Sequence, residues 1–419
     1  MKVGHARYDL TPAEGTEFYL LGYKNPERGK PAKGIHDHIF CNALLFEQDG
    51  ETAFLWTADL LELEDDMAEE AKTRLNERFG IDRDHIVLAV MHDHSSIRDY
   101  HKNWPVGKFS QAYYDFLMET ICNCYCDCEK NMQKATARWG SSIVTGYYSN
   151  RNHPGELADN EVIVVRFYDT EDKPFAAIVN WAVHSTALGA SNMYLTGDLA
   201  GNTCRKLGET WGYYPLMLNG AGGDSSNRND RKGKDFAELD RASSGLCEAI
   251  AKIPTDKRLV DGRITCQTLS HAIYPNPHKY REELERTIAA IESGTLHTVD
   301  DMPASHLLEK CREQLSLPPQ NLLLSFGVLD IGGLRLFVFP GELGAPHGKA
   351  LKRSSGKPAL VAGYANGFHY YFLAKEDYGI SFETIGNPVP AGEAEKIVEK
   401  LIRSGKLLDL EAGTYSCEE

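Results

Sequence analysis

Short apolar runs of strand length alternate with amphipathic helical segments along most of this chain, and this alternation limits the folds it can adopt. Strand-like runs at 43–46 and 53–57 precede a segment, 64–79, in which apolar residues recur every four positions, and another strand-like run follows at 86–91. Because such a mixture places sheets between helices, the sequence predicts an α/β fold of mixed β-sheets flanked by helices.

Two β-hairpins and several helices are expected later in the chain. The hairpins are predicted from paired strand-like runs around turn residues, 162–168 with 175–181 and 322–330 with 334–339. Helices are predicted at 198–207, 235–253 and 391–403. Two charged helical segments at about 278–316 have the composition of a solvent-facing helical insertion. With neither a repeat nor a linker in the sequence, we expect a single domain over residues 1–419.

The charge balance argues against several classes of partner. The chain has 45 Lys and Arg against 60 Asp and Glu, a net charge of −15, and no basic stripe that would suit a nucleic acid. No apolar segment of signal-peptide or membrane-spanning length stands out. We therefore expect a cytoplasmic protein with a small-molecule substrate and no stable membrane association, and homo-oligomers remain an open alternative.

Cysteines are numerous, and four of them form the run Cys122, Cys124, Cys126 and Cys128. This spacing suggests a metal cluster, but it continues a helical segment, in which alternate residues point in different directions around the axis. We interpret these cysteines as reduced thiols packed as small apolar side chains of a helix.

A candidate metal site begins with His92 and His94 in VMHDHSS, two positions apart after a strand-like run. On an extended strand end both side chains would face one cavity, although an isolated pair of this kind more often binds backbone groups at a turn. Three further possible ligands, His184, Glu342 and Tyr371, also follow strand-like runs. Imidazole, carboxylate and phenol donors together suit Zn²⁺.

These stretches, taken in order, resemble the motifs of the neutral ceramidase family, zinc amidases that split N-acylsphingosines. MHDHSS resembles the family's THTHSGP, and NWAVHSTAL followed by TGD resembles NWFAVHGT followed by SGD. The family's PGE recurs at 340–342, and its GLANxYxxYxxxxExY resembles the segment 363–378. The resemblance extends over most of the chain and implies the catalytic fold of that family.

Residue by residue, the resemblance implies a zinc ion held by His92, His184, Glu342 and Tyr371. It places His94 and Arg151 at the reacting centre, where a metal-activated water would attack a carbonyl carbon while both side chains offset the charge on its oxygen. His94 would also deliver a proton to the leaving group.

Other residues of the matching stretches have two readings each. Ser225 either binds the substrate or belongs to a glycine-rich connection with turn-forming residues. Asp198 either accepts a hydrogen bond from a ligand histidine or caps the helix that starts there. Asn366 and His369 are predicted to bind substrate, and His369, with Arg98 and Arg151, suggests a polar ligand.

The sequence departs from the family pattern in two places. The family's C-terminal β-sandwich has no expected counterpart here, and Phe382 and Glu383 stand where its late tyrosine is expected. We therefore expect a hydrolase of a small soluble amide, ester or lactone. The alternatives are a metal-dependent isomerase or lyase on a sugar-like substrate, and a non-catalytic metal-containing binding protein.

Overall fold

The computed structural model describes residues 1–296, 304–379 and 381–411. Its first sheet has the strand order β5-β4-β3-β1-β6. The strands are β1 (Lys2–Asp9), β3 (Phe40–Gln48), β4 (Glu51–Ala58), β5 (Ile86–Val90) and β6 (Gln133–Lys134). The predicted strands at 43–46, 53–57 and 86–91 are thus confirmed, with bounds that differ by a few residues.

Two more sheets complete the framework, in the orders β12-β10-β9-β7-β14 and β15-β16-β17-β19. The second sheet contains β7 (Thr136–Ile143), β9 (Glu161–Tyr168), β10 (Pro174–Trp181), β12 (Leu216–Asn219) and β14 (Lys257–Arg258). The third contains β15 (Ile264–Ile273), β16 (Leu322–Ile331), β17 (Leu334–Val338) and β19 (Ala359–Ala362). Both predicted hairpins, β9 with β10 and β16 with β17, are confirmed.

Each of these sheets contains one parallel strand pair joined by a helix, as a parallel connection requires. The three units are β4–α1–β5, β10–α3–β12 and β17–α7–β19, with α1 (Asp65–Phe79), α3 (Asp198–Trp211) and α7 (Ala345–Ser354). Short two-stranded ladders add β2 (Gly34–Ile35) with β11 (Tyr194–Leu195), β8 (Ser149–Asn150) with β13 (Ser225–Ser226), and β18 (Glu342–Leu343) with β20 (Tyr371–Phe372).

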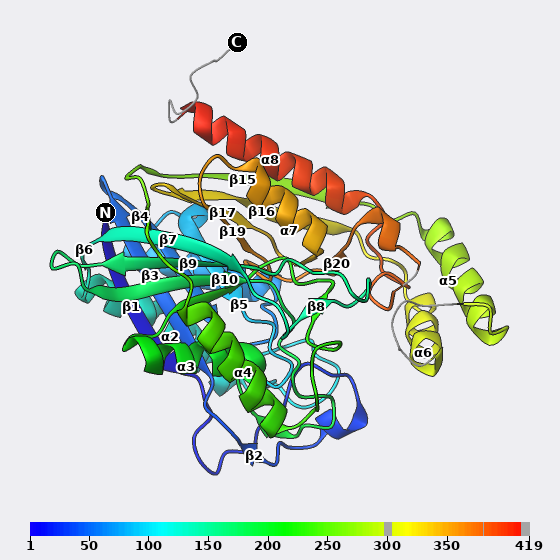
Figure 1. Cartoon of the computed structure of the whole chain (residues 1–419). Coiled ribbons are helices and arrows are strands. Elements are labelled where there is room, and N and C mark those ends of the chain that lie inside the picture. Colours follow the sequence, from blue (N-terminus) through cyan, green and yellow to red (C-terminus); the bar gives the residue numbers. More distant parts are fainter. Residues whose placement is uncertain (297–303, 380, 412–419) are drawn as a thin grey trace.

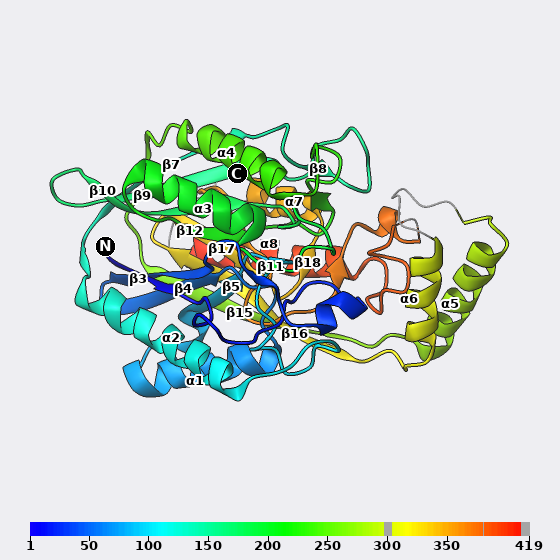
Figure 2. The same cartoon turned by 90° about the horizontal axis from the view of Figure 1, so that it is seen from below.

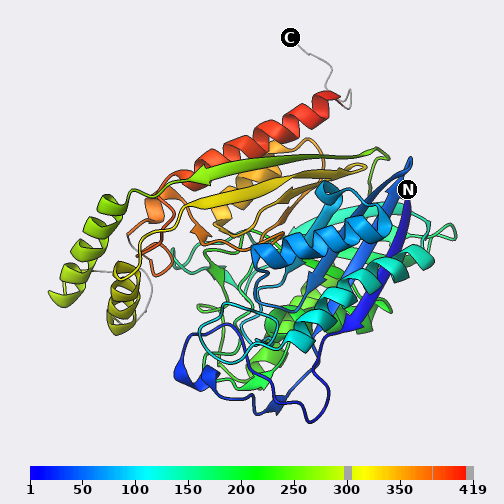
Figure 3. The ribbon, with the colours of Figure 1, turned by 180° about the vertical axis from the view of Figure 1, so that it is seen from behind.

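Helices cover the outer faces of the sheets. Figure 2 shows α1 and α2 (Gln111–Lys130) on one side, and α3 and α4 (Phe236–Ala251) on the opposite side. The third sheet is covered by α7 and by α8 (Glu393–Glu411), which runs along it in Figure 1. Seen from behind in Figure 3, α1 and α2 lie across the first sheet. The predicted class, mixed sheets flanked by helices, is confirmed.

Strand alternation explains why both faces of the sheets are buried. On β3, Cys41 and Leu45 pack with the helical layer of α1 and α2, whereas Leu44 and Phe46 join an apolar cluster between the sheets. Residues of β9, β16 and β17 enter that same central cluster from the other sheets. Successive side chains of a strand point to opposite faces, so apolar residues on both faces produce a layered core.

The charged segments predicted at about 278–316 contain α5 (Pro277–Glu292) and α6 (Ala304–Leu315), which pack against each other and project from the body of the fold (Figure 1). Residues 297–303 of that prediction lie outside the described residues. Among the described residues, no helix is both long enough and apolar enough to cross a membrane.

Two predictions about helices have a clear outcome. The cysteine run does lie in α2, where Cys124 is buried with its Sγ 3.7 Å from Sγ of Cys41, so the interpretation as packed thiols is confirmed. The last helix was predicted to end at 403 but continues to Glu411. The helix continues past Gly405, whose missing side chain makes room for Arg335: an added Cβ would lie 2.8 Å from Nη1, and this guanidinium binds Asp409 one turn further on.

Candidate functional site

The candidate site lies where strands of all three sheets end. The segment after β5 carries His92 and His94, and the segment after β10 carries His184. The segment after β17 leads into Glu342, and the one after β19 carries Tyr364. Carboxyl ends of strands joined by helical crossovers meet at one edge of an α/β fold, which is where ligand sites form.

Three short backbone pairings fix these segments against one another. Asp93 pairs with Ser185, so the loop of His92 and His94 lies beside the loop of His184. In the ladder of β18 with β20, Glu342 is directly paired with Tyr371. The ladder of β13 with β8 pairs Ser225 with Asn150, which brings the following residue, Arg151, to the same edge. Residues up to 279 positions apart in the sequence thereby share one small volume.

All three imidazoles turn Nε2 toward this volume, because Nδ1 of each ring binds a backbone carbonyl. Nδ1 of His92 lies 3.0 Å from the Leu61 carbonyl oxygen, Nδ1 of His94 lies 2.8 Å from that of Gly22, and Nδ1 of His184 lies 2.8 Å from that of Gly222. A carbonyl oxygen only accepts hydrogen bonds, so each Nδ1 carries the proton and each Nε2 is unprotonated; that of His184 lies 3.4 Å from Nη2 of Arg151. That is the tautomer of a metal ligand.

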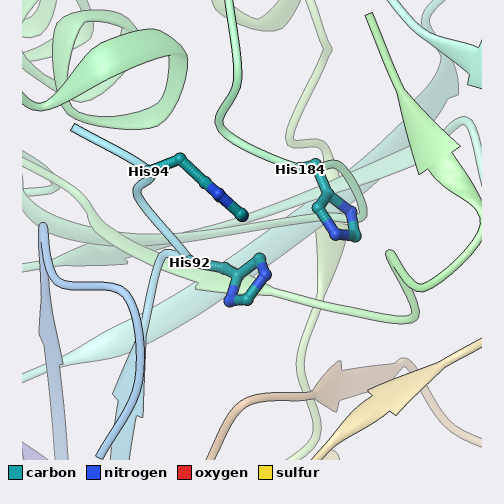
Figure 4. Close-up of side chains that lie close together, drawn as sticks. All are labelled: His92, His94 and His184. Atoms are coloured by element: carbon teal, nitrogen blue, oxygen red, sulfur yellow. The ribbon is translucent and has the colours of Figure 1, made fainter. Parts of the chain in front are cut away.

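The Nε2 atoms of the three histidines converge. One ring nitrogen of each histidine lies within 4.8 Å of those of the other two, and Figure 4 shows the three side chains pointing toward a common space. Nε2 of His92 and of His94 is buried without a hydrogen-bond partner among the described residues. A buried nitrogen that has lost water and gained no protein partner is costly, and a cation at this point would remove that cost.

The backbone conformation that brings the histidines together is not the one predicted from the sequence. β5 ends at Val90, and His92 has a left-handed backbone with φ of 56°, instead of the expected extended strand end. Its ring lies at 86° to the ring of His94. Left-handed backbone at Tyr364, with φ of 53°, belongs to the same site. Such strain in residues other than glycine collects at functional sites.

Glu342 and Tyr371 complete a four-donor arrangement. Oε2 of Glu342 lies 3.0 Å from Nε2 of His184 and 3.6 Å from Nε2 of His92, and the Tyr371 hydroxyl lies 3.5 Å from Nε2 of His184. Two donors bound to one tetrahedral zinc ion lie about 3.3 Å apart. These three separations are compatible with donors that share one ion, and the nitrogens of His92, His94 and His184 form a second possible donor set.

Burial sets the protonation states around this cluster. It lowers the pKa of His92, His94 and His184 well below the usual value, so the imidazoles are neutral at pH 7. It also raises the pKa of Glu342, and burial together with the Glu342 charge raises that of Tyr371 well above 10. A divalent cation would reverse the last two effects by stabilising the anionic donors.

Arg151 lies at the edge of the cluster and is held from two directions. Its Nη2 donates to the Gly223 carbonyl at 2.8 Å, and its Nε lies 2.9 Å from Oε1 of Glu383. The same Nη2 is 3.5 Å from the Tyr371 hydroxyl. Glu383 thus balances the Arg151 charge, from the part of the sequence where the family tyrosine was expected.

Four of the sequence-predicted residues have other surroundings. Asn366 binds the backbone of β5, with Oδ1 2.8 Å from the Leu88 amide, and so holds that strand instead of lining the cluster. His369 lies 3.1 Å from Asp65 at the start of α1. The Ser225 hydroxyl is buried without a described partner, and its carbonyl oxygen, 3.1 Å from Nδ1 of His184, helps to orient that ring.

Asp198 does not accept from a ligand histidine in the structure. Its carboxylate accepts from the backbone amides of Ala187, Leu188 and Leu199. Backbone carbonyls fill the predicted role of orienting the imidazoles. Asp198 instead ties the loop after His184 to the first turn of α3. The N-cap of α3 is Gly197 and has no side-chain cap, so the structure places Asp198 in neither predicted role.

Sequence reasoning missed Tyr364, Gly22 and the part played by Glu383. The Tyr364 hydroxyl donates to Oε2 of Glu342 at 3.3 Å, and its ring stacks 4.4 Å from that of His92. Gly22 lies so close to His94 that an added Cβ would be 2.5 Å from the His94 Cα. No local pattern marks either residue, because both act through contacts that are distant in sequence.

Residues 1–211 match the family model described as neutral/alkaline non-lysosomal ceramidase, N-terminal. The chain belongs to this family. The matched half contains His92, His94, Arg151 and His184, and the resemblance read from the sequence motifs is confirmed. Glu342 and Tyr371 lie beyond it, and their place in the site rests on the geometry of β18 and β20.

Individual ceramidases extend the comparison. The chain is 26% identical over 221 residues to neutral ceramidase A of Dictyostelium discoideum, covering 48% of this chain and 30% of that protein. It is 23% identical over 241 residues to neutral ceramidase of Drosophila melanogaster, covering 53% and 34%. The matched segment thus spans about a third of these curated relatives.

Solved structures extend the match over nearly the whole chain. The crystal structure of neutral ceramidase from Pseudomonas aeruginosa superposes with a TM-score of 0.77 at 19% identity, covering 98% of this chain and 74% of that one. A ceramidase complexed with C2 gives a TM-score of 0.75 at 17% identity, with coverages of 98% and 75%. At these identities the match shows a common fold.

Proposed function

We propose that this chain is a zinc-dependent hydrolase that cleaves a C–N amide bond, or an ester or lactone bond, of a small substrate. The observation that carries the proposal is the convergence of proton-free imidazole nitrogens with Glu342 and Tyr371 in a buried cluster. Membership in a family named for ceramide hydrolysis, which is amide cleavage, supports the reaction type.

The donor set supports zinc as the metal. His92, His184, Glu342 and Tyr371 offer two nitrogen and two oxygen donors, whereas calcium and magnesium prefer oxygen alone. Zinc, when bound, would supply Lewis-acid activation of a water molecule and of the substrate carbonyl at neutral pH. A site with three histidine ligands, in which His94 also binds the ion, is the alternative arrangement of the same cluster.

We assign proton transfer to His94. Its Nδ1 is held by the Gly22 carbonyl, so its basic nitrogen is Nε2, and His94 is the most exposed residue of the three. Burial keeps this ring neutral at pH 7, which lets it take a proton from the attacking water and pass it to the leaving nitrogen. The water's oxygen then bonds to the carbonyl carbon as the C–N bond breaks.

Arg151 is assigned to the charge that develops on the carbonyl oxygen. Its guanidinium reaches within 3.5 Å of the Tyr371 hydroxyl and keeps its charge in the buried site, because the Glu383 carboxylate lies beside it. A preorganised cation of this kind stabilises the transition state more than the ground state. The loss of Arg151 should therefore lower kcat more than it changes substrate binding.

Turnover in ¹⁸O-labelled water tests the reaction class. A hydrolase must place one solvent oxygen in the acid product, whereas an isomerase or lyase working through the same metal would leave the product unlabelled. His94→Ala should lower turnover while zinc stays bound, as measured by metal analysis of the purified protein. Wild-type protein that binds no zinc would contradict the proposal, and zinc bound without any turnover would favour the non-catalytic alternative.

A further inference from the structure

Arginines gather around the candidate site of a chain whose net charge is −15. Nη2 of Arg151 lies 3.4 Å from Nε2 of His184, and Arg28 binds the Leu21 carbonyl, next to the Gly22 carbonyl that holds His94. Arg231 donates from Nη1 to the Thr186 carbonyl, two residues after His184. A local concentration of positive charge in an acidic protein indicates an anionic ligand.

Arg28 differs from the other buried arginines of the described chain in what its guanidinium contacts. It is fully buried, and its Nη1 donates to the Leu21 carbonyl at 3.0 Å, but Nε and Nη2 have no hydrogen-bond partner among the described residues. By contrast, Arg98 donates from all three nitrogens to backbone carbonyls. Asp93 and Asp198 act on Arg28 only from beyond ion-pair distance, and burial raises the pKa of both acids.

The edge of the Arg28 guanidinium formed by Nε and Nη2 can be compared with the same edge of Arg335, which binds a carboxylate. In Arg335, Nε and Nη2 donate to the two carboxylate oxygens of Asp330, at 2.8 and 2.7 Å. A carboxylate matches this edge of a guanidinium because its two oxygens accept two parallel hydrogen bonds. Arg28 presents the same two donors, buried and unused.

One short segment connects Arg28 to the reacting centre. The carbonyl of Leu21 accepts from Arg28, and the carbonyl of the next residue, Gly22, lies 2.8 Å from Nδ1 of His94. The ring of Tyr23 then lies 5.1 Å from the Arg28 guanidinium and 5.1 Å from the His94 ring. Residues 21–23 therefore contact both Arg28 and the histidine to which we assign proton transfer.

We propose that Arg28 binds a carboxylate of the substrate, so that the preferred substrate is an amide bearing a carboxylate near the scissile bond, as in an N-acyl amino acid. This rests on the proposed function for the reaction, while the anion site itself stands on Arg28. Arg231, half-buried and bonded to the Thr186 carbonyl, adds positive charge that draws the anion in. The neutral amide of the same acid lacks both interactions.

Binding of N-acetylglycine and N-acetylglycinamide to the metal-loaded protein, measured by calorimetry, tests the site. We expect the carboxylate to bind about 10-fold or more tightly than the amide, because hydrogen bonds to charged groups are the strong ones. Arg28→Met should abolish this difference, Arg28→Lys should keep part of it, and Arg231→Met should reduce it. Arg138→Met, which removes an exposed charge paired with Asp172, is the matched control and should leave it unchanged.

Equal affinity for both compounds in the wild type, or a preference that survives both Arg28→Met and Arg231→Met, would overturn the proposal. Tighter binding of N-acetyl phosphoethanolamine than of N-acetylglycine would assign a phosphate in place of the carboxylate and overturn it as well. Hydrolysis measured in parallel separates the two proposals. Binding that depends on Arg28 without any turnover would support the anion site and contradict the hydrolase. Turnover of both compounds without dependence on Arg28 would support the hydrolase and contradict the anion site.

Discussion

Two buried charged clusters of this protein are built in opposite ways. Around Arg335, both edges of the guanidinium are filled by the carboxylates of Asp330 and Asp409, and Lys357 binds the same acids from outside. Around His92, two imidazole nitrogens have no hydrogen-bond partner among the described residues, and Glu342 faces the unprotonated Nε2 atoms of His92 and His184. A cluster whose polar groups are all hydrogen-bonded holds elements together, here α8 on the third sheet. A cluster with unpartnered buried groups is instead suited to binding a ligand.

The largest effect should come from removing one donor of the cluster around His92. We expect Glu342→Ala to lose bound zinc and to lower kcat/KM by more than about 100-fold, since even residues behind the ligands are worth 10- to 100-fold. The stability of the metal-free protein should not fall, because a buried carboxylate with a raised pKa is removed. Metal analysis and urea unfolding measure the two quantities. Wild-type zinc content in this variant would contradict the ligand assignment.

Breaking the cluster around Arg335 should have the opposite result. Arg335→Leu leaves Asp330 and Asp409 buried with Lys357 as the remaining described cation, so the free energy of unfolding should fall by about 3–5 kcal/mol. Zinc content and kcat/KM of the folded fraction should stay at wild-type values. A loss of zinc without a loss of stability would mean that the two clusters are not independent.

The pH dependence of stability separates the clusters further. Burial lowers the pKa of His94 in the folded state below its unfolded value of about 6.5, so the unfolded chain binds a proton that the folded chain does not. Metal-free wild-type protein should therefore lose stability as the pH falls below 6.5, and by more than His94→Asn, which does not titrate. Chemical unfolding at pH 7.5 and 5.0 gives the difference. Identical losses would show that His94 is not buried in its neutral form.

The smallest effect is expected in a third region, the cysteine run of α2. Cys126 is the half-buried member of the run, so Cys126→Ser should change the unfolding free energy by less than about 0.5 kcal/mol. Zinc content should not change, because the thiols pack in the helix and do not form a metal site. Substoichiometric zinc in this variant alone would contradict that interpretation.

Much of the fold could be predicted because local patterns agree with it. The strands around 43–57, the helix at 64–79 and both hairpins follow from periodicity and turn residues, which are local properties. The end of α8 could not be predicted, because Gly405 looks like a helix break until its contact with Arg335 is known. That contact joins segments about 70 residues apart, and no local pattern carries it.

The site shows the same limit. Motif resemblance brought together the histidines, Glu342 and Tyr371, whose side chains the structure also places in one cluster. It could not anticipate the left-handed turn at His92, the Tyr364 hydroxyl bonded to Glu342, or the carbonyls that orient each imidazole. Backbone carbonyls have no sequence signature, and the pairing of Glu383 with Arg151 depends on loops that meet only in the folded chain.

The two-residue ladder of β18 with β20 has a consequence for how the molecule can be divided. Glu342 and Tyr371 face each other there, while His92 and His184, the two histidines proposed as zinc ligands, come from the half that matches the family model. A fragment cut near residue 211 would carry only half of the donor set, however well it folded. An ion bound by these four side chains would cross-link the early and late parts of the polypeptide. Removing it with a chelator should therefore make the contact between the two parts more accessible to proteases.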